Sequence, residues 1–186
     1  MRTDVLGVGF DDISVTEACV YAYEAFDAEK KACIVTPNPE IVWACRQNEE
    51  LRGALNSAGL VLPDGIGIII AARILGTPVK AGRVPGIDFI AALFSKMAEA
   101  GKSVFLYGAK PGVADEAGAR LTEKYPGLII AGTSDGYTAD DALVIEQINA
   151  ARPDLLLVCL GSPKQELWMA QNISRLDVRL CAGLGG

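Results

Sequence analysis

The sequence contains no histidine, and that absence excludes several kinds of active site. Ser-His and Cys-His nucleophile arrangements are impossible, and most metal sites lose their commonest ligand. Acid–base chemistry must therefore use Asp, Glu, Lys, Tyr or Cys. The five cysteines are scattered, without a C-x-x-C pair. Such a set is typical of buried thiols in a reducing cytoplasm, not of a disulfide framework or a zinc site.

Long hydrophobic runs and an excess of basic residues are also absent. The longest apolar run, IGIIIAARIL, contains Arg73 and is shorter than the roughly 20 residues that span a bilayer. The N-terminus has no long apolar stretch before a cleavage site, so we predict no signal peptide. The net charge of −6 and the pI of about 4.7 argue against a nucleic-acid partner. We expect a cytoplasmic protein.

Hydrophobic patterning predicts an α/β fold, with one catalytic domain over residues 1–186. Short runs rich in Val, Ile and Leu alternate with longer amphipathic stretches. This alternation favours a Rossmann-like parallel sheet with helices on both faces. Strands are predicted over 4–9, 32–36, 59–62, 103–107, 128–131, 155–160 and 178–182. Helices are predicted over 15–29, 39–57, 65–75, 86–100, 112–124, 138–151 and 163–175.

Several predicted strands are followed by loops rich in polar residues, glycine or proline. These loops read TPNPE, PDGIG, GAKPG, GTSDGY and GSPKQE. Open parallel sheets bind ligands at the carboxyl ends of their strands, so we expect the loops to converge on one site. Structural roles are an alternative for part of each loop. Asn38 fits a helix N-cap, and Ser162 with Gln165 fits a capping box with Pro163 at the first helical position.

Asp64 lies between a predicted strand and a predicted helix, followed by Gly65 and Gly67. It can serve as a helix cap or as a catalytic base, and the glycines would let a substrate approach the backbone closely. The segment YGAKPGVA around Lys110 is similar to an anion-binding helix N-terminus. It matches neither common phosphate-binding fingerprint. No D-x-D triplet is present, so the usual means of holding a metal-bound sugar nucleotide is missing.

Five stretches, in this order, closely resemble the WecG/TagA/CpsF family of bacterial glycosyltransferases: TPNPEIV, LPDGIGI, RVPGID, LYGAKPGVA and GSPKQELW. The resemblance runs from about residue 3 to the end of the chain. It implies transfer of a sugar from a UDP-sugar to a polyprenyl-diphosphate-linked acceptor at the cytoplasmic membrane face. The TagA-like branch transfers N-acetylmannosamine to undecaprenyl-diphosphate-GlcNAc in wall teichoic acid synthesis. Related members transfer other sugars, such as the corresponding uronic acid or glucose, for surface polysaccharides.

The resemblance also implies roles for individual residues. Asp64 becomes the leading candidate for the base of an inverting, metal-independent transfer. The remaining catalytic set that it implies is Thr36, Asn38, Arg83 and Gln165. We expect the UDP-sugar donor to contact Gly108, Ala109, Lys110, Asp135, Gly136, Tyr137, Gly161 and Lys164. No metal and no further cofactor are expected.

The sequence stops at CAGLGG, directly after a predicted strand. We expect a further C-terminal segment, because in the family it supplies arginines and apolar residues that complete the site and contact the membrane. Without that segment we expect a catalytic core with weak or no activity. Two other functions stay open: a nucleotide-binding module without chemistry and, less favoured, a dehydrogenase, for which the dinucleotide fingerprint is missing. Assembly into a homo-oligomer is also left open.

Overall fold

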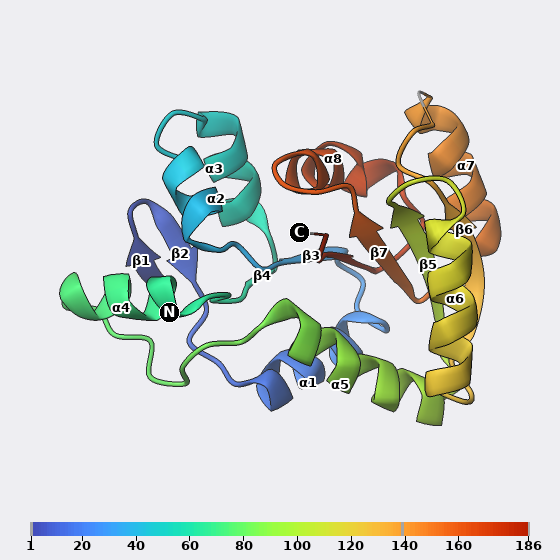
Figure 1. The fold of residues 1–186 in the computed structure, drawn as a ribbon, viewed down its shortest axis with the longest axis horizontal. Helices are drawn as coiled ribbons and strands as arrows, with labels where there is room; N and C mark the ends of the chain where they lie inside the picture. Colours follow the sequence, from blue (N-terminus) through green and yellow to red (C-terminus); the bar gives the residue numbers. More distant parts are fainter. Residues whose placement is uncertain (1, 139, 186) are drawn as a thin grey trace.

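A parallel β-sheet forms the centre of the molecule. The computed structural model describes residues 2–138 and 140–185. Its main sheet has six strands, all parallel to their neighbours, in the order β4-β3-β8-β7-β5-β6 (Figure 1). The predicted α/β, Rossmann-like fold is confirmed. The strands are β3 (Ala32–Val35), β4 (Leu60–Val61), β5 (Ser103–Gly108), β6 (Ile129–Ser134), β7 (Leu155–Cys159) and β8 (Leu180–Gly183).

Helices cover both faces of this sheet. They are α1 (Val15–Ala25), α3 (Glu49–Ser57), α5 (Gly86–Glu99), α6 (Val113–Lys124), α7 (Asp141–Ala151) and α8 (Lys164–Asn172). In β7, Leu156 and Val158 pack in the layer with α3, α7 and α8, whereas Leu155 and Leu157 pack with α1, α5 and α6. This alternation follows from strand geometry. Because both faces are covered, the strands appear in the sequence as continuous apolar runs.

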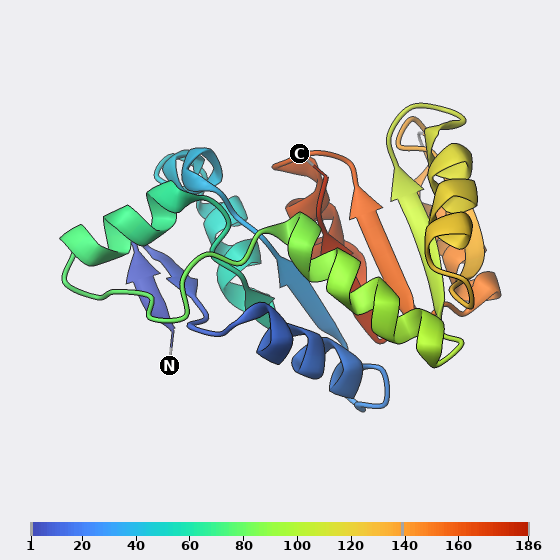
Figure 2. The same cartoon turned by 60° about the horizontal axis from the view of Figure 1, so that its bottom comes forward.

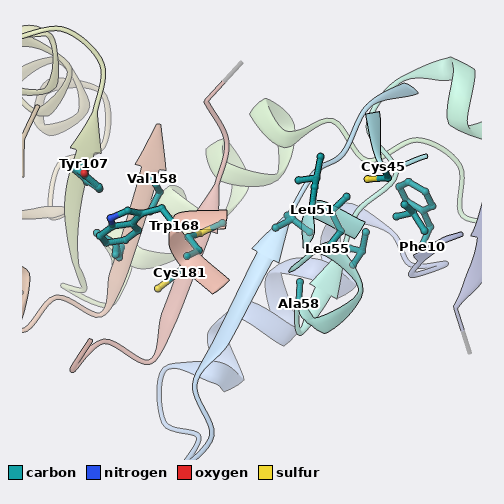
Figure 3. Close-up of a cluster of buried hydrophobic side chains, with 14 of the residues drawn as sticks. Phe10, Cys45, Leu51, Leu55, Ala58, Tyr107, Val158, Trp168 and Cys181 are labelled. Carbon is teal, nitrogen blue, oxygen red and sulfur yellow. The ribbon is translucent and has the colours of Figure 1, made fainter. Parts of the chain in front are cut away.

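A pair of aromatic side chains in contact anchors α8 to the sheet. The ring centroids of Tyr107 on β5 and Trp168 on α8 lie 4.9 Å apart, and Trp168 Nε1 donates to Asp141 Oδ1 on α7 at 2.9 Å. Figure 3 shows both rings beside Val158. Burial, with the nearby carboxylates of Asp141 and Asp135, raises the pKa of Tyr107 to about 12. The phenol therefore stays neutral, and its ring packs in the core against Trp168. This contact holds α8 in position.

The first predicted strand, 4–9, is wrong as a member of the main sheet. It forms an antiparallel hairpin of β1 (Thr3–Val5) and β2 (Val8–Phe10), which make a separate two-stranded sheet. Leu6 and Gly7 both have positive φ, 55° and 90°. Two such residues in succession form the tight turn that reverses a strand. The pattern DVLGVG therefore encodes a reversal that hydrophobicity alone does not reveal.

The predicted helix over 39–57 is divided in two. It forms α2 (Pro39–Ala44) and then α3. The Asn48 side chain accepts a hydrogen bond from the Leu51 amide at 2.9 Å and so caps the start of α3. A side chain that caps a new helix competes with continuation of the preceding one. The other predicted helices correspond to observed ones within a few residues at each end.

Helix α4 (Ile66–Ile74) packs against β1 and presents an apolar stripe to solvent. Ile66, Ile70 and Ile74, four residues apart on one helix face, are 63%, 52% and 79% exposed. Ile68 and Ala72 on the other side are buried. Within the ranges that the structure describes, none of the helices combines the length and the hydrophobicity required to cross a bilayer.

Candidate functional site

The carboxyl ends of the parallel strands lie at one edge of the sheet, where the loops of the predicted site converge. Figure 2 shows β3, β7 and β5 with their arrowheads toward the same side of the molecule. Three of the cavities in the described part of the chain open along this edge. The first, called here the Asp64 cavity, has a volume of about 350 Å³ and is lined by residues that include Thr36, Asn38, Asp64 and Gln165. These are four of the five residues predicted for catalysis.

Asp64 does not cap the helix that follows it. The N-cap of α4 is Gly65, with no side-chain hydrogen bond. Asp64 Oδ2 instead accepts the backbone N–H of Gly86, the first residue of α5, at 3.2 Å. Among the described residues no hydrogen bond reaches Asp64 Oδ1. The carboxylate is therefore held through one oxygen, and the other is left to accept a proton or a hydrogen bond.

Thr36 and Asn38 reach the same cavity from the end of β3. A Cβ atom placed on Gly86 would lie 3.2 Å from Thr36 Oγ1, so the threonine packs against the residue whose amide holds Asp64. Asn38 is confirmed as the N-cap of α2, since its Oδ1 accepts the Ile41 amide at 3.0 Å. Asn38 therefore has a structural role and also lines the cavity.

The capping box predicted for Ser162 and Gln165 is wrong. The N-cap of α8 is Pro163, and no side chain caps this helix. Gln165 is instead buried, 3% exposed. Its Oε1 accepts the Gly185 amide at 3.0 Å, and its Nε2 donates to Glu166 Oε1, also at 3.0 Å. The side chain thus connects the start of α8 to the loop after β8.

Gly65 and Gly67 serve helix packing, because Pro39 occupies the side of each glycine on which a Cβ atom would lie. A Cβ atom on Gly67 would lie 2.6 Å from Pro39 Cγ, and one on Gly65 would lie 3.1 Å from Pro39 Cδ. Gly65 also has a φ of +97°, which few other residues adopt. The two glycines therefore let the first turn of α2 pack against the start of α4.

The second cavity, called here the lysine cavity, has a volume of about 590 Å³ and lies over the ends of β5 and β7. Its lining includes Ala109, Lys110, Gly136, Tyr137 and Lys164. Lys164 Nζ donates to the Gly136 carbonyl at 3.2 Å, and the Gly136 amide donates to the Ala109 carbonyl at 2.9 Å. Lys110 and Lys164 are both exposed, and their ammonium groups can bind an anion that enters this cavity.

The other three residues predicted to contact the donor, Gly108, Asp135 and Gly161, do not line the lysine cavity, although each is next in sequence to a residue that does. Gly108 ends β5, and Gly161 follows β7. Asp135 Oδ1 accepts the Tyr137 amide at 2.8 Å and so shapes the loop after β6. The first turn of α6 lines a different cavity, of about 330 Å³, together with Asp115 and Asp135. That cavity has two carboxylates and no basic residue in its lining, which disfavours a phosphate there, whereas the lysine cavity has one carboxylate, Asp141, beside two lysines.

Arg83 is the predicted catalytic residue that the structure leaves outside the Asp64 cavity and the lysine cavity. It is exposed in the loop between α4 and α5 and does not line either cavity. The next residue, Val84, donates its amide to the Pro63 carbonyl at 2.9 Å. The backbone at Arg83 is thereby held beside the segment that carries Asp64, while its side chain projects into solvent.

The described part of the chain offers little for metal or thiol chemistry. It contains no group of three or more His, Cys, Asp or Glu side chains placed to hold a metal ion. Cys159 lines the lysine cavity, and burial raises the pKa of its thiol to about 11. The thiol is therefore protonated at neutral pH and is a poor nucleophile.

The sequence model of the family described as "Glycosyl transferase WecG/TagA/CpsF family" matches residues 3–186. The chain belongs to this family. A WecG/TagA/CpsF relative from Bacillus spizizenii is 39% identical over 160 residues, which are 86% of this chain and 62% of the relative. One from Staphylococcus aureus is 29% identical over the whole of this chain and 73% of its own length. Both relatives are named N-acetylglucosaminyldiphosphoundecaprenol N-acetyl-beta-D-mannosaminyltransferase. The chain thus spans about three fifths of the Bacillus relative's length.

Two further residues contact predicted site residues, and their roles could not be predicted from the sequence. Gly86, within the stretch RVPGID, supplies the amide that holds Asp64. Glu166, within GSPKQELW, supports Gln165. Both lie in motifs that the sequence analysis singled out, but their local patterns suggest only a turn and a helix start. Their roles depend on contacts that no local pattern reveals.

Proposed function

We propose that this chain carries the catalytic core of an N-acetylmannosaminyltransferase. The reaction would move N-acetylmannosamine from UDP-ManNAc to undecaprenyl-diphosphate-GlcNAc, with inversion at the sugar carbon and without a metal. The names of the Bacillus and Staphylococcus relatives support the donor sugar and the acceptor. The observation that carries the proposal is the Asp64 cavity, which gathers a held carboxylate, a hydroxyl and two amide side chains at the carboxyl edge of the sheet.

In this reaction Asp64 acts as the general base. A hydroxyl of the acceptor GlcNAc gives its proton to Asp64 Oδ1 while its oxygen forms a bond to C1 of the donor sugar. The bond between C1 and the UDP oxygen breaks, and UDP leaves with the electron pair. Gly86 holds the other carboxylate oxygen, so that Oδ1 keeps a fixed direction. Thr36 and Asn38 are placed to bind hydroxyl groups of the two sugars.

The lysine cavity is the proposed position of the UDP diphosphate. Lys110 and Lys164 line it from neighbouring strand ends, and their charges oppose the negative charge that develops on the leaving group. Tyr137 is 68% exposed at the cavity and offers a ring on which the uracil base can stack. The donor sugar would then extend toward the Asp64 cavity, because the segment 160–165, which includes the start of α8, borders both cavities.

We also propose a peripheral position at the cytoplasmic face of the membrane. The exposed stripe of α4 begins two residues after Asp64, and Ile87, just after Gly86, is 74% exposed. From 66 to 88 the charged residues are Arg73, Lys80, Arg83 and Asp88. Three of these are basic in a chain of net charge −6. An apolar stripe with basic neighbours suits an anionic lipid surface that presents a polyprenyl-linked acceptor.

A transfer assay tests the proposal. The full-length protein is incubated with a lipid-diphosphate-GlcNAc analogue and, in separate reactions, with UDP-ManNAc, UDP-ManNAc-uronic acid or UDP-glucose. The proposal predicts a disaccharide lipid only with UDP-ManNAc and equal yield with a metal chelator. Product from another UDP-sugar would show that UDP-ManNAc is not the donor. UDP binding without any transfer would instead identify a nucleotide-binding module.

A further inference from the structure

Glu166 is a buried carboxylate in the first turn of α8. Its side chain and that of Gln165 belong to residues that are each only 3% exposed. Glu166 Oε1 accepts a hydrogen bond from Gln165 Nε2 at 3.0 Å. Glu166 Oε2 is the one buried side-chain N or O atom, within the part of the chain that the structure describes, that has no hydrogen-bond partner. A buried carboxylate with so few partners is costly, so its presence calls for a compensating role.

Helix capping does not supply that role. Glu166 occupies the third position of α8, where a glutamate can complete a capping box by accepting the N-cap amide. The N-cap here is Pro163, which has no N–H. A carboxylate near a helix N-terminus also interacts with the helix dipole, by up to about 2 kcal/mol in partly buried geometries, but that interaction orients no neighbouring side chain. The hydrogen bond to Gln165 is therefore the specific interaction that Glu166 makes.

That hydrogen bond selects one orientation of the Gln165 amide. An ionised carboxylate only accepts hydrogen bonds, so it requires the NH₂ end of the neighbouring amide to face it. The oxygen of Gln165 is then directed to the other side, where it accepts the Gly185 amide at 3.0 Å. Gly185 and Gln165 both line the Asp64 cavity. The acceptor oxygen of Glu166 on one side and the Gly185 amide on the other thus require that an oxygen, and not an NH₂ group, of Gln165 points to the loop at the candidate site.

We propose that Glu166 is a positioning residue that fixes the amide of Gln165 with its oxygen toward the Asp64 cavity. The substrate group recognised there is consequently a donor, either a sugar hydroxyl or an amide N–H. A phosphate is disfavoured, because the amide oxygen and the buried carboxylate behind it both oppose negative charge. This division assigns sugar recognition to Gln165 and the diphosphate to the lysine cavity. The statement about substrate rests on the proposed transferase function.

A double-mutant cycle tests whether Glu166 acts through Gln165. Glu166→Gln keeps the size of the side chain but removes the charge, so the Gln165 amide can rotate. We expect kcat to fall roughly 10- to 100-fold, as for a misplaced catalytic group, with KM for the UDP-sugar changed less than about twofold. Adding Glu166→Gln to Gln165→Ala should cause no further loss. Additive losses in the cycle would overturn the proposal, as would a normal kcat for Glu166→Gln.

A measurement without substrate separates this inference from the proposed function. In ¹⁵N-labelled protein, the side-chain NH₂ signals of Gln165, identified by their absence in Gln165→Ala, report on the hydrogen bond. Glu166→Gln should shift these signals and speed their exchange with water, whereas the exposed control Glu123→Gln should not. Unchanged Gln165 signals in folded Glu166→Gln protein would contradict the positioning role. If the signals shift but the unmodified protein transfers no sugar, the proposed function fails and the structural inference stands.

Discussion

The backbone amide of Gly86 and the carboxylate of Asp64 are joined by a hydrogen bond of 3.2 Å that links the start of α5 to the end of β4. The two residues are separated by the whole of α4 and the loop after it. Gly86 also packs against Thr36, which directly follows β3. Three segments therefore fix the direction of one carboxylate, which makes this junction the centre of the candidate site.

Gly86→Ala tests the packing at this junction. A Cβ atom there would lie 2.8 Å from Leu184 Cδ2 and 3.2 Å from Thr36 Oγ1, so these side chains or the amide must move. We expect transfer activity to fall roughly 10-fold or more while the protein remains folded. Gly53→Ala is the matched control, because a Cβ atom at Gly53 in α3 has nothing within 4 Å. The control should keep full activity and gain up to about 1 kcal/mol. Equal activity in both variants would argue against a tight junction.

Lys110→Ala and Lys164→Ala test the lysine cavity. Each change removes a cationic group from the proposed diphosphate position, and we expect UDP to bind roughly 3- to 10-fold more weakly, about 0.7–1.4 kcal/mol. Isothermal titration calorimetry measures the effect, with Lys124→Ala on α6 as the control. The affinity should fall at higher salt and stay the same with a chelator. A strict need for Mg²⁺ or Mn²⁺ would show that the phosphate site is misassigned.

Asp154 is expected to stabilise the fold in a pH-dependent way at the opposite edge of the sheet. It accepts hydrogen bonds from Lys102 Nζ at 2.9 Å and from the Ser103 amide at 2.7 Å, which join the starts of β7 and β5. Burial alone would raise the pKa of Asp154, but the hydrogen bonds from Ser103 and Lys102 lower it below its ordinary value. The stabilisation is thus present above the ordinary carboxyl pKa and disappears as the pH falls through the lowered one.

Asp154→Asn should therefore destabilise the protein by about 1–2 kcal/mol at pH 7, a modest figure because the pair is partly exposed. The difference from the unmodified protein should shrink between pH 7 and an acidic pH that lies below the lowered pKa of Asp154. Denaturant unfolding at both pH values measures it, with exposed Glu123→Gln as the control. A difference that is constant with pH would assign the effect to packing and not to charge.

Changing Ile66, Ile70 and Ile74 to serine tests the lipid surface. The three side chains are exposed, so the variant should fold normally but sediment less with vesicles that contain anionic lipid. Serine at three other exposed apolar positions, Val113, Ile129 and Leu143, is the matched control. If the α4 variant loses self-association and keeps its vesicle binding, the stripe is an interface between two copies of the chain and the membrane proposal is wrong.

The parallel sheet could be predicted because its strands are covered on both faces. Leu155 to Val158 alternate between two apolar layers, which leaves a continuous apolar run in the sequence. Once the strands were placed, their order along the chain also placed Thr36, Asn38, Asp64 and Gln165 at one edge. The hairpin at residues 3–10 was misassigned because its reversal depends on two backbone angles and not on hydrophobicity.

The details of the candidate site could not be predicted, because they depend on contacts between distant segments. Asp64 could be expected at a helix start, yet it binds the first amide of a later helix, 22 residues away. Gln165 fits a local capping pattern but pairs with Gly185, 20 residues further on. The helix and turn propensities of the local sequence predict neither contact, because both depend on how distant segments pack together.

Asp64→Asn in the transfer assay tests the central claim most directly. Asparagine retains an oxygen that can accept the Gly86 amide, so the melting temperature should change little, but it cannot act as a base. The account predicts that formation of the disaccharide lipid from UDP-ManNAc falls at least about 100-fold, with UDP affinity retained. Asp27→Asn, an exposed acid near the amino end of β3, should transfer at the unmodified rate. Near-normal turnover by the Asp64→Asn protein would contradict the account.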